Sequence, residues 1–285
     1  MAPPPISTMQ TVEAAGLPIG DDHPPRVMGV LNVSDESTYD PSVFTDPDEA
    51  ASYVDGLVEE GADIVDIGLE SANKRFEVLS ADEELDRLDT ALETLDRTAR
   101  DAVFSIETRY HEVAAAALDA GFDMVNDICG FADPEMAPTC EARDAAVVKM
   151  ASPPDLTRPG ALTSVDEIHD ALARDLTDET IVDPAFGGWS EAKTLDDDRE
   201  IFHRLGEFRD LARPMLVSIN RKNFLGEVVG RETDERLPAS LAATALAVER
   251  GANVIRTHDV AETRDAALIG DALGASDLAD PTAQR

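Results

Sequence analysis

Lysine is nearly absent from this chain, which has only four lysines among its 24 basic residues, against 59 acidic residues. The formal net charge of −35 excludes a general binder of nucleic-acid backbone, because phosphate would be repelled over most of the surface. The acidic residues are dispersed, which predicts a solvated acidic shell rather than a disordered tail. Such a shell, with arginine preferred to lysine, is typical of halophilic proteins. We therefore expect the fold to weaken when salt no longer screens the repulsion.

Cysteine and long apolar runs are also scarce. Cys129 and Cys140 are the only cysteines, which excludes a disulfide framework and fits a reducing cytoplasm. No run approaches the roughly 18 consecutive apolar residues of a membrane span, and the N-terminus lacks the basic, apolar pattern of a signal peptide. The composition therefore predicts a soluble, cytoplasmic protein whose partners include neither a membrane nor nucleic acid.

From Arg26 onward, short apolar runs alternate with helical patterns rich in alanine, leucine and glutamate. The expected strands are 27–32, 63–68, 103–107, 124–127, 145–149, 180–183, 215–219 and 253–256. The expected helices are 47–60, 81–99, 111–120, 133–142, 164–175, 195–211, 235–250 and 260–273.

This alternation implies parallel strands joined by right-handed crossovers, and eight such units close into an α/β fold, the single (β/α)8 TIM barrel. An open doubly wound sheet is the alternative, but no Gly-rich dinucleotide fingerprint follows an early strand and no unit is left over. Residues 1–25 are rich in proline and polar residues and predict a loose N-terminal arm. We expect the barrel over residues 26–275 and a C-terminal tail at 276–285.

Polar and charged side chains follow the expected strand ends, where a barrel places its active site. They are Asn32, Asp66, Glu70, Glu107, Asn126, Lys149, Asp183, Lys222, Arg256 and His258. All four lysines belong to this set or to the loops directly after it. One such residue alone could be a helix cap or a supporting hydrogen-bond partner, but a ring of buried charges favours a site.

Two kinds of chemistry are combined in this ring. Carboxylates and amides suit a flat heterocycle with amino and oxo groups. A second group suits phosphate and consists of Arg221, Lys222, Arg256 and His258. The expected ligand is therefore a heterocycle joined to phosphate.

Six short motifs at the expected strand ends resemble dihydropteroate synthases and the wider pterin-binding barrel family. They are MGVLNV at 28–33, DIGLES at 66–71, MVNDI at 124–128, DPAFG at 183–187, SINRK at 218–222 and RTHDV at 256–260. The resemblance extends from Met28 to about Ala267. Each motif alone would be weak, but all six occur in the order found in the family.

The resemblance implies an enzyme that joins 6-hydroxymethyl-7,8-dihydropterin pyrophosphate to 4-aminobenzoate in folate biosynthesis. The products would be 7,8-dihydropteroate and pyrophosphate, so the enzyme would be a transferase. Carried over by position, Lys222 and Asp183 would be catalytic and Asn32 would help to hold a magnesium ion. The residues that bind substrate would be Glu107, Asn126, Asp183, Lys222, Arg256 and His258.

Departures from the family motifs are concentrated after the first two strands. The residues after Asn32-Val33 are Ser34-Asp35-Glu36 rather than Thr-Pro-Asp, and Ala72-Asn73-Lys74 replaces Thr-Arg-Pro. Three alternatives therefore stay open: a methyltransferase that uses a methylated reduced pterin, a non-catalytic pterin-binding protein, and a Schiff-base aldolase based on Lys222 or Lys149. The oligomeric state stays open, with a homodimer as one possibility, because two-fold dimers are common and the family often forms them.

Overall fold

Eight parallel strands form one sheet in the computed structural model, which describes residues 9–34, 42–70, 78–99, 101–187, 190 and 192–274. The order is β8-β7-β6-β5-β4-β3-β10-β9. Their bounds are β3 Arg26–Asn32, β4 Ile64–Gly68, β5 Val103–Glu107, β6 Met124–Asp127, β7 Ala146–Met150, β8 Thr180–Asp183, β9 Leu216–Val217 and β10 Val254–Thr257. The expected C-terminal tail at 276–285 lies outside the described residues.

The two outer strands of this order also meet. Val182 of β8 forms a parallel bridge with Met215, just before β9, and the Val182 N–H donates to the Pro214 carbonyl at 2.9 Å. This contact closes the sheet, so the expected (β/α)8 barrel is confirmed and the open doubly wound alternative is wrong.

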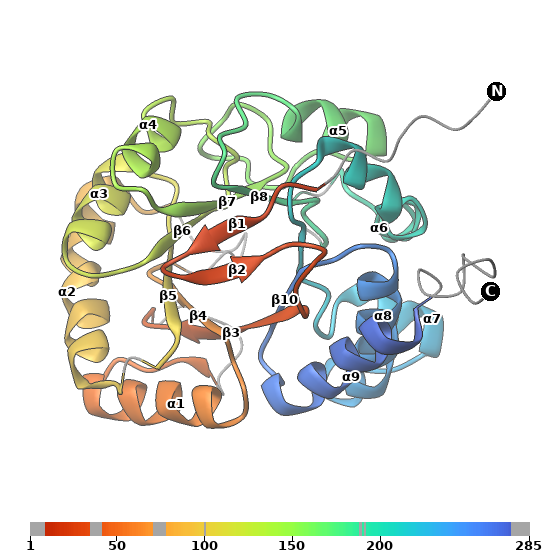
Figure 1. The fold of residues 1–285 in the computed structure, drawn as a ribbon, viewed down its shortest axis with the longest axis horizontal. Helices are drawn as coiled ribbons and strands as arrows, with labels where there is room; N and C mark the ends of the chain where they lie inside the picture. The colour runs from red at the N-terminus through yellow and green to blue at the C-terminus, as the bar shows by residue number, and fades with distance from the viewer. Residues whose placement is uncertain are drawn as a thin grey trace, which may run out of the picture.

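Helices surround the barrel on its outside (Figure 1). They are α1 Pro47–Glu59, α2 Ala81–Arg97, α3 His111–Asp119, α4 Met136–Glu141, α5 Val165–Leu172, α6 Leu195–His203, α7 Asn223–Val229, α8 Leu237–Glu249 and α9 Val260–Leu273, with 3-10 segments at Leu205–Leu211 and Thr233–Glu235. Reciprocal capping boxes begin α2, α5 and α6 at Ser80, Ser164 and Thr194. The expected helix 195–211 is divided at Arg204, and α7 was not expected.

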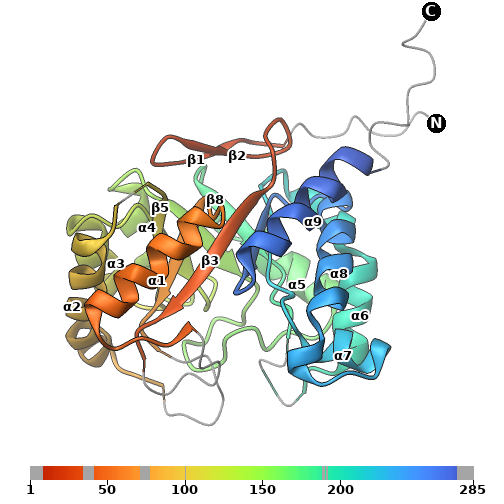
Figure 2. The same ribbon diagram turned by 90° about the horizontal axis from the view of Figure 1, so that it is seen from below.

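The N-terminal segment contains a β-hairpin, so the expectation of a loose arm is wrong for residues 12–19. Strands β1 (Val12–Ala14) and β2 (Leu17–Ile19) pair antiparallel. Figure 2 shows the hairpin across one end of the barrel, at the end from which β3 starts. Its buried side chains pack against the inward-facing residues at the N-terminal ends of the strands, including Met28, Ile64, Met124, Ala146, Ile181, Leu216 and Val254. The hairpin therefore closes the apolar end of the barrel.

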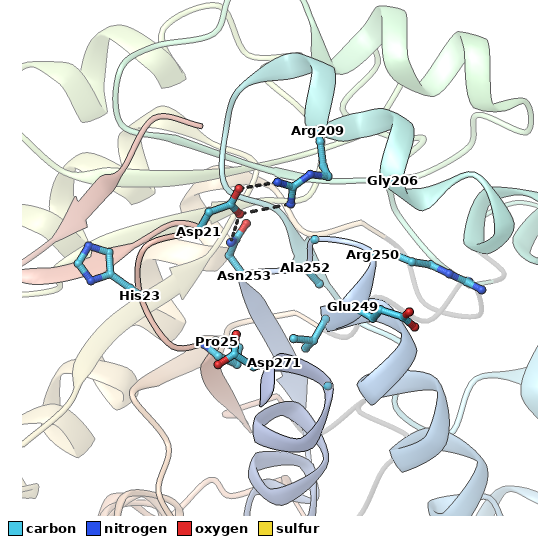
Figure 3. Close-up of a pocket in the computed structure, with 13 residues that line it drawn as sticks. Asp21, His23, Pro25, Gly206, Arg209, Glu249, Arg250, Ala252, Asn253 and Asp271 are labelled. Atoms are coloured by element: carbon cyan, nitrogen blue, oxygen red, sulfur yellow. Dashed lines mark hydrogen bonds and ion pairs between the residues drawn. The ribbon is translucent and has the colours of Figure 1, made fainter. Parts of the chain in front are cut away.

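A polar contact fastens the chain between the hairpin and β3. The Asp21 carboxylate accepts hydrogen bonds from Arg209 at 2.6 and 3.3 Å and from Asn253 at 3.1 Å (Figure 3). These residues border a surface cavity of about 490 Å³, and a second cavity of about 600 Å³ borders the hairpin at Gly16 and Leu17. Both lie at the N-terminal ends of the strands, opposite the end where a barrel carries its active site.

Within the described residues, no helix is both long and apolar enough to cross a membrane.

We predict that Ile19→Ala destabilises the barrel strongly, because Ile19 is fully buried between the hairpin and the strand ends. Truncating such a side chain lowers the free energy of unfolding by about 2–5 kcal/mol. Chemical denaturation at one fixed high salt concentration measures this loss. Glu13→Ala on the exposed side of the same hairpin is the control and should change stability by less than about 0.5 kcal/mol. Equal effects of the two substitutions would show that the hairpin does not close the core.

Candidate active site

Asp66 is the centre of a polar layer inside the barrel, at the C-terminal ends of the strands. Its side chain is fully buried and accepts from Ser105 Oγ at 2.6 Å, from Asn126 Nδ2 at 2.8 Å and from Arg256 Nε at 2.8 Å. The four residues come from β4, β5, β6 and β10. Because a carboxylate only accepts, Asp66 orients the Asn126 amide with its nitrogen toward β4.

Arg256 lies between two carboxylates. Its Nε contacts Asp66, and its Nη2 contacts Glu107 Oε2 at 2.7 Å. Burial alone would lower the pKa of Arg256, but Asp66 and Glu107 outweigh burial and raise it. Burial also raises the pKa of Glu107 despite the neighbouring guanidinium. The arginine is therefore rigidly held, and most of its charge is balanced from within the protein.

Asp183 ends β8, and Lys222, in the turn between β9 and α7, lies close enough for the two charges to interact. The Asp183 Oδ1 accepts from the Ala185 N–H at 2.7 Å, and burial raises the pKa of this carboxyl to about 6. Burial and the nearby Arg256 lower the pKa of Lys222. Gly187 makes room for the lysine: a Cβ at this glycine would lie 2.9 Å from Lys222 Nζ, and its φ is +110°.

Asn32 ends β3 beside the same layer. Its Nδ2 donates to Ser42 Oγ at 3.2 Å, which leaves the amide oxygen as the atom available to a ligand. A Cβ at Gly68 would lie 2.9 Å from this oxygen, so a glycine is needed at the end of β4. An amide oxygen is a hard ligand of the kind that Mg²⁺ accepts, and the residue present therefore fits the expected metal.

His258 follows β10 directly. Burial, followed by the charge of Arg256, lowers the pKa of His258 to about 3. The imidazole is therefore neutral at cellular pH and can offer an anion a ring N–H but no charge.

Two of the expected lysines do not face the polar layer. Lys149 projects outward from β7, donates to the Arg174 carbonyl and lies 4.8 Å from the centre of the Phe131 ring. Lys193 donates to the Ala185 carbonyl and pairs with Asp198 at 3.5 Å. Placing Lys149 in the ring was wrong, because alternate residues of a strand point to opposite sides. Lys193 lies in the loop between β8 and α6, as expected. An aldolase based on Lys149 is thereby excluded.

Other expected residues lie at the rim or beyond the described ranges. Glu70 pairs with Arg109 at 2.9 Å, and Arg109 also donates to the Leu156 carbonyl at 2.7 Å. Lys74 and the altered segments at 35–41 and 71–77 lie outside the described residues. Ser105 and Gly187 were missed as parts of the site, although Ser105 is two residues before Glu107 and so faces the same side of β5.

A second group of possible metal ligands lies at the start of α3. His111 Nδ1 is 2.9 Å from Asp133 Oδ2 and 3.1 Å from Glu112 Oε2. Asp133 also accepts from the His111 backbone N–H at 3.0 Å, at a helix N-terminus whose dipole disfavours cations. We therefore assign this group to stabilising the helix start.

The site geometry agrees with a comparison against protein families. The model described as pterin binding enzyme matches residues 28–258, which include every expected site residue. The chain belongs to this family. The resemblance inferred from the six motifs is thereby confirmed.

Individual members of the pterin-binding family are similar over most of this chain. A protein of Haloferax volcanii named "Probable bifunctional folylpolyglutamate synthase/dihydropteroate synthase" is 34% identical and matches 90% of the chain, which spans only 32% of that relative. The dihydropteroate synthase of Bacillus subtilis is 31% identical, with 87% of this chain and 88% of the relative covered. The solved dihydropteroate synthase of Xanthomonas albilineans with 4-aminobenzoic acid is 32% identical, with a TM-score of 0.78 over 96% of this chain and 100% of that one.

We predict that Gly187→Ala displaces Lys222, because the new methyl group would lie within contact distance of its side chain. Pterin affinity, measured by calorimetry, should fall by about tenfold or more. Gly16→Ala is the matched control: its φ of +84° gives a comparable backbone cost, but no atom lies within 4 Å of the added Cβ. The prediction fails if the two alanine variants bind a pterin equally well.

Proposed function

We propose that this chain is a dihydropteroate synthase, a transferase of folate biosynthesis. Its substrates would be 6-hydroxymethyl-7,8-dihydropterin pyrophosphate and 4-aminobenzoate. The observation that carries the proposal is the closed polar layer of Asp66, Asn126, Glu107 and Arg256, with Asp183 and Lys222 beside it. Relatives that match most of the chain bear the synthase name, which favours a synthase over a methyltransferase or a non-catalytic binder.

The heterocycle is assigned to the interior of the barrel. Asn126 and Asp183 are only 3% and 5% exposed, so their hydrogen bonds to a ring would form away from competing water. Asp183 would accept from ring N–H groups, and Glu107 would bind a further ring nitrogen. Lys222 would contact the pterin and line the binding site of the arylamine. Arg256 and His258 would bind phosphate, the histidine through a neutral ring N–H.

The reaction exchanges one bond at the pterin methylene carbon for another. The carbon–oxygen bond to pyrophosphate breaks, a carbon–nitrogen bond to the arylamine forms, and the proton that this nitrogen loses is taken up by the released pyrophosphate. We infer a dissociative order, because the electron-rich pterin can stabilise a methylene cation while fixed protein charges stabilise the departing anion. The chain therefore needs no covalent nucleophile, and Lys222 needs no Schiff base.

Asn32 is the residue that we assign to magnesium, through the amide oxygen left available by its bond to Ser42. When bound, magnesium would neutralise charge on the departing pyrophosphate. The side chain of Asn32 would orient the pyrophosphate through that contact.

One assay tests the proposed function directly. Purified protein in high salt receives the pterin pyrophosphate, 4-aminobenzoate and magnesium, and both dihydropteroate and pyrophosphate are followed. We expect the two products to appear in equal amounts. Release of pyrophosphate without dihydropteroate, or neither product, would contradict the proposal.

We predict that Asn32→Ala raises the magnesium concentration needed for half-maximal activity, because one hard oxygen ligand is lost. The parent and the variant are compared in magnesium titrations at saturating substrates. Asn253→Ala is the control, because it removes an amide just before β10, at the opposite end of the barrel, where Asn253 donates to Asp21. Identical magnesium curves for Asn32→Ala and the parent would refute the metal role.

Pterin affinity should decrease as pH falls through about 6, because burial raises the pKa of Asp183 to about 6. Above this pH the ionised carboxylate accepts from the ring, and below it the protonated group presents a hydrogen to the same donors. Asp183→Asn should bind weakly at both pH values and lose this component of the pH dependence. Calorimetry on either side of the transition measures both effects, and an unchanged pH profile in the variant would remove Asp183 from the ring contact.

We also propose a homodimer. Exposed apolar side chains on α8 and α9, Leu246, Leu268, Ile269 and Leu273, would be covered by a second copy of the chain. Sedimentation in high salt tests this assignment. The cytoplasmic location and the halophilic character stay predictions from the composition.

A further inference from the structure

Arg221 forms the turn that joins β9 to α7, immediately before Lys222. Its φ is +52°, in the left-handed region that few residues other than glycine adopt. Its N–H donates to Ser240 Oγ at 2.8 Å, and its carbonyl accepts from Arg236 Nη1 at 3.1 Å. Helix α8 and the residue before it therefore hold the backbone of this turn from both sides.

The side chain of Arg221 is bound just as completely. Its Nε and Nη2 donate to the two oxygens of Asp259, both at 2.8 Å, and its Nη1 donates to the Asp234 carbonyl at 2.9 Å. Asn220 Nδ2 adds a bond to the same Asp259 carboxylate at 2.8 Å. The guanidinium and the carboxylate are only 14% and 15% exposed. Asp259, which follows His258, thus ties the whole turn to the segment between β10 and α9.

This pairing with Asp259 makes the role of Arg221 different from that of the neighbouring Lys222. A planar guanidinium that forms a bidentate pair with a carboxylate is oriented and neutralised, and binding phosphate would require that pair to break. Lys222 lies one residue further along, where it reaches the Gly187 backbone beside Asp183. The position of Lys222 depends on the direction in which the turn leaves β9.

We propose that Arg221, clamped by Asp259, is a positioning residue that directs Lys222 into the pterin site rather than a ligand of phosphate. The inference rests on the proposed function, because that function makes the pterin the ligand that Lys222 contacts. It assigns to Asp259 a role that needs no contact with substrate. Asp259 begins α9 but forms no side-chain cap, so replacing its charge does not remove a helix cap.

The test compares Arg221→Gln, Asp259→Asn and the double variant. Affinities for 6-hydroxymethylpterin and for inorganic pyrophosphate with magnesium are measured by calorimetry at one fixed high salt concentration. We expect each single variant to weaken pterin binding by about ten- to hundredfold, because Lys222 is misplaced. The double variant should bind the pterin no more weakly than the single variant with the lower pterin affinity, since both substitutions break the same clamp. Pyrophosphate affinity should change less than threefold.

A phosphate-binding Arg221 gives the opposite pattern. Arg221→Gln would then weaken pyrophosphate binding, whereas Asp259→Asn would strengthen it by releasing the guanidinium, and pterin affinity would be unchanged. This result would overturn the proposal, as would additive losses in the double variant.

A control variant and a folding measurement accompany these binding experiments. Arg231→Gln removes an arginine from an exposed pair with Glu235 in the same surface stretch, and it should change neither affinity. Thermal melts in the same salt report whether each variant folds. Should Arg221→Gln not fold, Arg221→Lys keeps the charge without the planar fork and should still weaken pterin binding. Unchanged pterin binding in Arg221→Lys would overturn the proposal. Product formation by the parent tests the synthase itself, so a failure there is distinguishable from a failure of the clamp.

Discussion

The buried pair of Asp66 with Arg256 is the interaction on which the active end of this barrel depends. An isolated buried carboxylate costs several kcal/mol, and the cost is offset only when hydrogen-bond donors reach both of its oxygens. Asp66 meets that condition with donors from three other strands, Ser105 on β5, Asn126 on β6 and Arg256 on β10. Because all three donors share this carboxylate, a substitution of one donor is expected to disturb the positions of the other two.

The barrel interior is apolar at one end and polar at the other, and the two ends contribute differently to the protein. At the N-terminal end, the hairpin covers an apolar layer that contributes stability and needs no exact hydrogen-bond geometry. At the C-terminal end, carboxylates, an amide and cations are held by one another. In a chain with a net charge of −35, anions are repelled over most of the surface, so the phosphorylated ligand of the proposed function would have to be bound locally, at this enclosed end of the barrel.

Much of this architecture could be predicted from the sequence because buried parallel strands read as short apolar runs and their ends carry the polar side chains. All eight barrel strands and the Asp183 and Asn126 positions follow from that pattern. The hairpin at residues 12–19 could not, because strands of only three residues, one of which includes a proline, have no detectable period. The outward direction of Lys149 was available from alternation along β7, and the contact of β8 with β9 follows from the closure expected of eight such units.

Whether the charge of each arginine in the site is neutralised depends on a carboxylate that is distant in sequence. Arg221 and Lys222 are adjacent, yet Arg221 is paired with Asp259, which lies 38 residues further along the chain. Arg256 is paired across 190 residues with Asp66. A list of strand-end cations therefore overstates the charge available to an anion, because an acidic protein can neutralise arginines from within. What distinguishes Lys222 is the space left by Gly187, a feature of backbone conformation rather than of charge.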